Sequence, residues 1–145
     1  MKEVLEIKKL DEKAKVPTYG TEYSAGADLY ALLDSSIEIK PGETKMISTG
    51  LAMAIPTGYV GLIYARSSFG TKKGLAPANK VGVIDSDYRG EIKVCLYNHS
   101  EKTQTIEPYE RIAQIVFTPY LQVKFSEVSE LDETIRGDGG FGSTN

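Results

Sequence analysis

Residues 44–65 read TKMISTGLAMAIPTGYVGLIYA, and this run indicates the architecture of the chain. Thr49-Gly50 and Pro56-Thr57-Gly58 interrupt it, and glycine and proline at such places favour turns. Short apolar or alternating segments between turn signals are typical of β-strands. We therefore expect three successive strands with no helix between them, at residues 44–48, 51–55 and 59–65.

The same pattern of short segments continues on both sides of this run. Further strands are expected at residues 4–8, 28–32, 37–39, 81–84, 92–97, 103–106, 111–118 and 121–125. Strands at a spacing of roughly 8–12 residues are typical of an all-β sandwich or barrel. So many strands in one small domain favour an antiparallel, jelly-roll-like double sheet. Helix is expected only as a turn or two, at residues 67–71 and 126–131.

The chain has 145 residues, which is a usual length for one domain. We expect a β domain over residues 1–125 and an extended C-terminal arm over residues 126–145, because the strand pattern dissolves into an acidic, polar stretch there. A double sheet of this kind has strand edges, and cyclic oligomerisation is one way to cover them.

The composition argues against several classes of protein. The formal net charge is −3, so no overall positive field attracts nucleic acid or an anionic membrane, and an anion site must be a local cluster. No apolar run approaches the ~18 residues of a membrane span, and residues 1–6 lack the apolar core of a signal peptide. We therefore expect a soluble, cytoplasmic protein with no membrane partner and no direct nucleic-acid binding.

The single cysteine and the single histidine suggest neither a catalytic pair nor a zinc site. Cys95 lies in an alternating strand pattern that is typical of packing, and one cysteine fits a reducing compartment. His99 lies in a polar segment, Asn98-His99-Ser100, and is expected to be a solvated turn residue.

The last ten residues, 136–145, read RGDGGFGSTN. Glycines at a free end are costly to order, so a functional tail needs an agent that orders it. Glycine backbones and hydroxyls approach phosphate closely, and Arg136 can bind it as a fork, so we expect an anionic ligand. The tail also partly matches the dinucleotide-binding and P-loop patterns, but both need a strand before the glycines and a helix after them. A frayed tail without function is the remaining alternative.

The segment GVIDSDYRGEI, residues 82–92, predicts a β-hairpin with an acidic turn. Asp85 directly follows an apolar strand, and a carboxylate on such a rigid base suits a general base. Tyr88 offers a flat face to a sugar or a nucleobase, and free backbone groups at the turn could read the edge of a base. A plain Asp-rich turn without function is the alternative.

Two further clusters could bind a phosphate or a metal ion. Arg66 and Ser67 follow an apolar strand and could cradle phosphate, although a surface arginine before a helix N-cap would look the same. Asp28 lies among small residues and could meet the water shell of Mg²⁺, or it could simply cap a strand. Arg111 and Gln114 lie on an amphipathic strand and are expected to be surface residues.

Taken together, five segments resemble, in the same order, the five signature blocks of the trimeric dUTP pyrophosphatases (dUTPases). The segments are residues 25–31, 65–70, 79–92, 111–114 and 136–144. The most specific parts read GVIDSDYRG at residues 82–90 and RGDGGFGST at residues 136–144, and the resemblance spans essentially the whole chain. It implies an antiparallel jelly roll that assembles as a homotrimer, with three active sites at the subunit interfaces.

The resemblance also implies an activity, the hydrolysis of dUTP to dUMP and pyrophosphate with Mg²⁺ as cofactor. This reaction limits uracil incorporation into DNA and supplies dUMP for dTMP synthesis. One subunit would supply the hairpin with Asp85, a second the Arg66-Ser67 block and Gln114, and a third its C-terminal arm as a lid. Asp85 would activate the water that attacks the α-phosphorus, and Asp28 would meet Mg²⁺ through water. The implied substrate contacts are Arg66, Ser67, Ser68, Asn79, Gly82, Val83, Ile84, Tyr88, Lys93, Gln114, Arg136, Phe141, Gly142, Ser143 and Thr144.

Three of these contacts have more specific implied roles. Asn79 and the backbone near Asp85 would read uracil. Tyr88 would lie against the deoxyribose and leave no room for a 2′-hydroxyl, which gives specificity by steric conflict. Phe141 would stack on the uracil ring.

The chain departs from the pattern of many dUTPases at a few positions. Ser68 and Phe69 stand where glycine and leucine are common, so we expect the local packing at residue 69 to differ; Asn145 stands where glycine is common. A dCTP deaminase, which shares this fold, is one alternative, but it needs a glutamate-centred site that the matching segments lack. A regulatory protein that senses dUTP through its arm is the other alternative.

Overall fold

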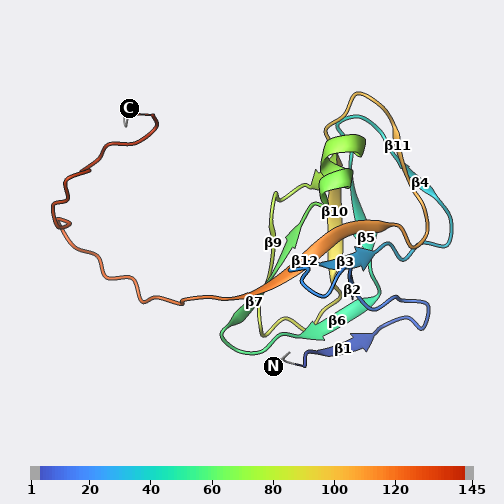
Figure 1. Cartoon of the computed structure of the whole chain (residues 1–145), viewed down its shortest axis with the longest axis horizontal. Coiled ribbons are helices and arrows are strands. Elements are labelled where there is room, and N and C mark those ends of the chain that lie inside the picture. The colour runs from blue at the N-terminus through green and yellow to red at the C-terminus, as the bar shows by residue number, and fades with distance from the viewer. Residues whose placement is uncertain (1–3, 143–145) are drawn as a thin grey trace.

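Short antiparallel strands make up most of the regular structure in the computed structural model, which describes residues 4–142 (Figure 1). The elements are β1 (Glu6–Lys9), β2 (Thr18–Tyr19), β3 (Ala27–Tyr30), β4 (Ile37–Ile39), β5 (Thr44–Ser48), β6 (Leu51–Ala54), β7 (Tyr59–Tyr64), the π-helical turn η1 (Phe69–Lys73), β8 (Leu75–Pro77), β9 (Gly82–Ile84), β10 (Lys93–Asn98), β11 (Gln104–Ile106) and β12 (Arg111–Pro119). Over residues 4–142, no helix has the length and apolar character needed to cross a membrane. The prediction of an all-β, antiparallel double-sheet fold is confirmed.

Strand β12 is the centre of the largest sheet, which runs β2-β3-β12-β7-β9. The remaining strands of the described residues pair as β5-β10-β8, β1-β6 and β11-β4, and all the pairs are antiparallel. On β12, Gln114 stands opposite Asp28 of β3 on one side and opposite Tyr64 of β7 on the other. This register brings three segments that are distant in sequence side by side.

Most of the buried apolar side chains among residues 4–142 belong to one cluster. Strand β10 shows the alternation behind it, because Val94, Leu96 and Asn98 are buried while their neighbours are more exposed. The largest fully buried side chains are Leu29, Ile39, Ile47, Leu51, Leu75, Ile92, Leu96, Ile106, Ile112, Ile115, Val94 and Asn98. Phe69 is also buried in this cluster, so the larger side chain at this position is accommodated within the core.

Several of the element predictions are wrong. Residues 121–125 alternate like a strand but form none, and residues 126–131 form no helix. The sequence also does not predict β2 and β8, which are two and three residues long and pair with β3 and β10. The helical turn expected at residues 67–71 is confirmed, since residues 67–73 are helical and η1 forms the larger part of this turn.

Beyond β12, the chain leaves the sheets as an extended segment. The Tyr120 N–H donates to the Gly58 carbonyl at 3.1 Å, and residues 120–142 contain no strand or helix. In Figure 1 this segment, in orange and red, runs well away from the sheets. Its apolar side chains, among them Leu131, Ile135 and Phe141, are exposed.

Candidate active site

A buried carboxylate holds two arginines together at the edge of β3, β7 and β12. Asp28 of β3 is only 7% exposed. Its Oδ1 accepts a hydrogen bond from Arg66 Nε at 2.6 Å, and its Oδ2 accepts one from Arg111 Nη1 at 3.2 Å. Two guanidinium groups around one carboxylate leave the cluster with one net positive charge. Arg66 uses only its Nε here, so both of its Nη groups are available to a ligand.

Gln114 fixes the backbone from which Arg66 projects. Its Nε2 donates to the Ala65 carbonyl at 3.0 Å, directly after β7 ends. Gly26, which follows Ala25 just before β3, leaves the space for this amide, because a Cβ at Gly26 would lie 2.9 Å from Gln114 Cδ. The small residues of this segment therefore allow Gln114 to reach Ala65.

These side chains line two adjoining grooves. The first has a volume of about 390 Å³ and is lined by Asp28, Arg66, Ser67, Arg111 and Gln114, among others. The second has about 260 Å³, shares both arginines and adds Ser68, Lys72 and Lys73. Lys73 forms an ion pair with Glu110. Arginines, lysines and hydroxyls in one groove suit a phosphate-bearing ligand.

Arg111 is a candidate that sequence reasoning missed, because its position on an amphipathic strand predicts only a surface residue. The pairing of β12 with β3 contains an irregularity between Arg111 and Ala113. Such a bulge changes the direction of a side chain, and here Arg111 reaches Asp28. No residue type in this strand indicates a bulge. The signal that could have singled out Arg111 is its place in the signature block at residues 111–114, of which only Gln114 was assigned a role.

Asp85 and Tyr88 lie on a connection between two sheets, so the predicted hairpin is wrong. Strand β9 pairs with β7, whereas β10 pairs with β5 and β8. Asp85 is exposed at the end of β9. The turn that follows is closed by its own hydrogen bonds, since Arg89 Nη1 donates to the carbonyls of Ser86 at 2.7 Å and Tyr88 at 3.0 Å. Asp85 therefore sits on a short strand followed by an ordered turn.

The predicted base-reading residues lie next to this turn. Asn79 precedes β9, and a Cβ built on Gly82 would lie 3.5 Å from Asn79 Nδ2, so the two residues are neighbours. Gly82, Val83 and Ile84 form β9 itself. Lys93 lies at the start of β10 and forms an ion pair with Glu91 at 3.4 Å.

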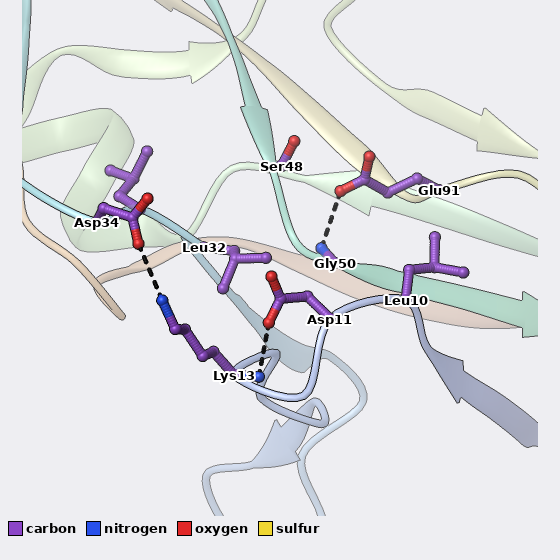
Figure 2. Close-up of a pocket in the computed structure, with 9 residues that line it drawn as sticks. Leu10, Asp11, Lys13, Leu32, Asp34, Ser48, Gly50 and Glu91 are labelled. Carbon is purple, nitrogen blue, oxygen red and sulfur yellow. Dashed lines mark hydrogen bonds and ion pairs between the residues drawn. The ribbon is translucent and has the colours of Figure 1, made fainter.

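A third groove, of about 370 Å³, lies near the same connection but contains none of the predicted site residues (Figure 2). Its charges pair among themselves, because Lys13 Nζ lies 3.3 Å from Asp34 Oδ1 and the Lys13 N–H donates to Asp11. The hydrogen bond to Asp34 raises the pKa of Lys13 above its usual value. Glu91 also lines this groove, and its Oε1 accepts the Gly50 N–H at 3.0 Å. We assign no ligand to this groove.

The predicted site residues form separate groups within one chain. Ile84 stands opposite Gly61 on β7, and Arg66 lies five residues further along the chain, a span of roughly 16 Å at the usual rise of a strand. Asp85 therefore lies near the opposite end of β7 from Arg66. The arm forms a third group, in which Arg136 Nε donates to the Gly139 carbonyl at 2.9 Å and the side chain of Phe141 is fully exposed.

Gly142 is the last residue that the structure describes, so Ser143 and Thr144 lie outside its range. The structure thus brings together Asp28, Arg66, Ser67 and Gln114, and separately the residues from Asn79 to Tyr88. It does not bring these two groups to each other or to the arm.

Within residues 4–142, no cluster of three or more histidine, cysteine, aspartate or glutamate residues could hold a metal ion. Both oxygens of Asp28 already accept a hydrogen bond from an arginine. Each oxygen retains a second lone pair, so the residue fits a contact with a hydrated cation better than direct coordination.

Known dUTPases match this chain in sequence and in structure over almost its whole length. The family model for dUTPase matches residues 12–145. The deoxyuridine 5′-triphosphate nucleotidohydrolase of Nautilia profundicola is 51% identical over 140 residues, with 97% of each chain covered. The protein of the same name from Neisseria meningitidis serogroup A is 47% identical over 143 residues, or 97% of this chain and 95% of its own. The solved structure of Staphylococcus bacteriophage 80alpha dUTPase with dUPNHPP has a TM-score of 0.90 and 28% identity, with 99% of each chain covered. The chain therefore belongs to the dUTPase family.

Proposed function

We propose that this protein hydrolyses dUTP to dUMP and pyrophosphate. The observation that carries the proposal is the groove around Asp28, Arg66 and Arg111, which presents guanidinium groups and the Ser67 hydroxyl to a polyphosphate. The relatives named above support the choice of nucleotide, because their names specify deoxyuridine 5′-triphosphate. Such a reaction would limit uracil incorporation into DNA and supply dUMP for dTMP synthesis.

In the proposed mechanism, Asp85 acts as the general base. Its carboxylate accepts a proton from a water molecule while the water oxygen forms a bond to the α-phosphorus. The bond from the α-phosphorus to the oxygen that bridges to the β-phosphate breaks, and pyrophosphate leaves with that oxygen. A triphosphate repels nucleophiles, so the rate depends on positioning and on neutralising its charge. The exposed place of Asp85 at the end of β9 leaves it open to both water and substrate.

The active site would be shared among three copies of the chain. Asp85 and Arg66 lie near opposite ends of β7, and within residues 4–142 the arm contributes no residue to the groove around Arg66. A homotrimer would bring the Asp85 turn of one copy to the phosphate groove of a second copy. The third copy would place its arm over the site as a lid, which excludes bulk water and opens for product release.

The nucleoside would be recognised by the β9 region and the arm. Backbone groups of Gly82, Val83 and Ile84, together with Asn79, would read the edge of uracil, and Tyr88 would lie against the deoxyribose. Phe141 would stack on the base, a contact worth about 1–3 kcal/mol. Its complete exposure in a single chain supports this role, because a partner would cover an otherwise exposed aromatic ring.

Further implied contacts would hold phosphate oxygens, and Mg²⁺ would accompany the substrate. The phosphate contacts besides Arg66 are Ser67, Gln114, Arg136, Ser143 and Thr144. Ser68, Lys93 and Gly142 would also contact the substrate. Mg²⁺ would be held mainly by the phosphates, with Asp28 meeting it through water, and would neutralise part of their negative charge.

The direct test is the release of pyrophosphate from dUTP, dTTP, dCTP and UTP, each with and without Mg²⁺. We expect rapid release from dUTP with Mg²⁺ and little from the other three nucleotides. Ammonia release from dCTP would instead identify a deaminase. Binding of dUTP without any pyrophosphate release would favour a regulatory role and overturn the proposal.

A further inference from the structure

The ring of Tyr88 folds back over Gly90. A Cβ built on Gly90 would lie 2.6 Å from Tyr88 Cζ and 2.9 Å from Tyr88 Cε2, closer than carbon atoms approach each other in proteins. Gly90 is not among the glycines with positive φ, so its backbone conformation does not require glycine. The space occupied by the Tyr88 ring is what excludes a side chain at this position.

A hydrogen bond to the backbone of Glu91 holds the phenol of Tyr88 in place. Tyr88 Oη donates to the Glu91 carbonyl at 3.0 Å. The Glu91 side chain is itself fixed, since its Oε1 accepts the Gly50 N–H at 3.0 Å, as Figure 2 shows. Next to it, the Ile92 N–H donates to the Leu51 carbonyl at 2.7 Å. The ring therefore rests on backbone that is tied to the turn between β5 and β6.

We propose that Gly90 is a positioning residue for sugar specificity, which acts by leaving room for the Tyr88 ring at the position where the ring excludes a ribose. This inference rests on the proposed function, in which Tyr88 lies against the deoxyribose. A ring excludes a 2′-hydroxyl only if its position is fixed, because a mobile ring would move aside for an extra oxygen. Tyr88 is 44% exposed, so the hydrogen bond of its hydroxyl to the Glu91 carbonyl is important for holding the ring in place.

The substitution Gly90→Ala should move the ring without unfolding the protein. The atoms that a new methyl group meets are the outer end of one exposed side chain, which can swing toward solvent. We expect the ratio of kcat/KM for dUTP to that for UTP to fall about tenfold or more, the size of effect that one methylene produces in a binding pocket.

The experiment is a double-mutant cycle on this ratio in the full-length protein, with wild type, Gly90→Ala, Tyr88→Ala and the double variant. If Gly90 acts through the ring, Gly90→Ala lowers the ratio in the wild-type background and has no further effect in the Tyr88→Ala background. Gly42→Ala is the matched control, because Gly42 has a φ of +73° with nothing within 4 Å of a new Cβ. It adds backbone strain without touching Tyr88, so the ratio stays at the wild-type value.

An unchanged ratio in folded Gly90→Ala, or an equal fall in both backgrounds, overturns the inference and leaves the proposed function standing. A wild-type protein that releases no pyrophosphate from dUTP, or that accepts UTP equally well, overturns both. If Gly90→Ala aggregates, Tyr88→Phe tests the premise that the ring must be fixed, because it removes the hydrogen bond to Glu91 and adds no atom. The ratio falls in that variant too; an unchanged ratio shows that the ring need not be held and overturns the inference.

Discussion

At the scale of single residues, Asp28 determines where the positive charge of the groove lies. Its buried carboxylate pairs with Arg66 from the end of β7 and with Arg111 from β12. The two arginines are far apart in sequence. Burying the Asp28 carboxylate without a positively charged partner would cost free energy. The pairing therefore offsets the cost of burying this carboxylate and directs two guanidinium groups to the same groove.

The substitution Asp85→Asn tests the general base. The amide keeps the size of the side chain but does not accept a proton from water, so we expect kcat to fall by about 10²–10⁴-fold while dUTP binding is retained. Single-turnover pyrophosphate release and equilibrium binding of dUTP measure the two effects. Asp87→Asn removes a neighbouring carboxylate from the same turn and should retain most of the rate. A normal kcat in Asp85→Asn would remove this residue from its proposed role.

The substitution Arg111→Ala tests the residue that sequence reasoning missed. Loss of a charge-assisted contact to phosphate should raise KM for dUTP about tenfold or more and change kcat much less. Steady-state kinetics at saturating Mg²⁺ separate the two parameters. Lys40→Ala, which removes an exposed cation elsewhere, is the control. A KM equal to that of the wild type would mean that Arg111 only supports Asp28.

At the scale of elements, the sequence predicts strands well and their partners poorly. β4 and β5 begin and end at the predicted residues, because each is bounded by turn residues. Residues 121–125 also alternate between apolar and polar side chains but form no strand. A strand needs a neighbouring strand to pair with, and the alternation of side chains does not show whether one is present. The predicted hairpin at residues 82–92 fails for the same reason, because β9 and β10 find partners far along the chain.

The candidate site was predictable to a similar extent. Asp28 lies among small residues in β3, Arg66 and Ser67 follow the apolar strand β7, and the structure places these three residues together. Arg111 was missed because its contact depends on an irregularity in strand pairing.

The burial of Asn98 was also missed, because a polar Asn-His-Ser segment looks like an exposed turn although Asn98 is 0% exposed.

The Asn98 side chain binds the end of β10 to neighbouring backbone groups, and Asn98→Ala tests how much these hydrogen bonds contribute to the free energy of unfolding. Its Nδ2 donates to the carbonyls of Ile39 and Lys102, both at 2.8 Å, and its Oδ1 accepts the Ser100 N–H at 2.9 Å. Removing the amide leaves buried groups without partners, so we expect a loss of about 3 kcal/mol in the free energy of unfolding. Urea unfolding at equal protein concentration measures it. The exposed neighbour His99→Ala should change stability by less than about 0.5 kcal/mol, and an equally small loss in Asn98→Ala would contradict the argument.

At the scale of the whole molecule, a single chain holds the parts of a site without assembling them. Arg66 follows one end of β7, whereas Asp85 follows β9 near the other end of β7. The segment after β12 runs away from the sheets (Figure 1). Assembly of copies is the direct way to unite them, because a closed symmetric ring repeats the same contact at every interface.

Mixing two inactive variants tests this sharing. Asp85→Asn and Arg66→Ala should each be inactive alone, but after denaturation and joint refolding some sites receive both intact groups from different copies. Random assembly at equal amounts predicts about a quarter of the wild-type activity. Pyrophosphate release before and after joint refolding measures the gain, and each variant refolded alone is the control. No recovery in refolded mixed assemblies would place both groups of a site in one chain.

The extended segment after Tyr120 has a consequence for how the enzyme would respond to dilution. Residues 121–142 could span up to about 75–80 Å if stretched, so their tip is a tethered reactant and not a free one. A tether of this kind supplies its end group at an effective concentration of around millimolar, whatever the amount of enzyme in solution. Capping of bound nucleotide would therefore stay equally fast at nanomolar protein, for as long as the copies remain associated.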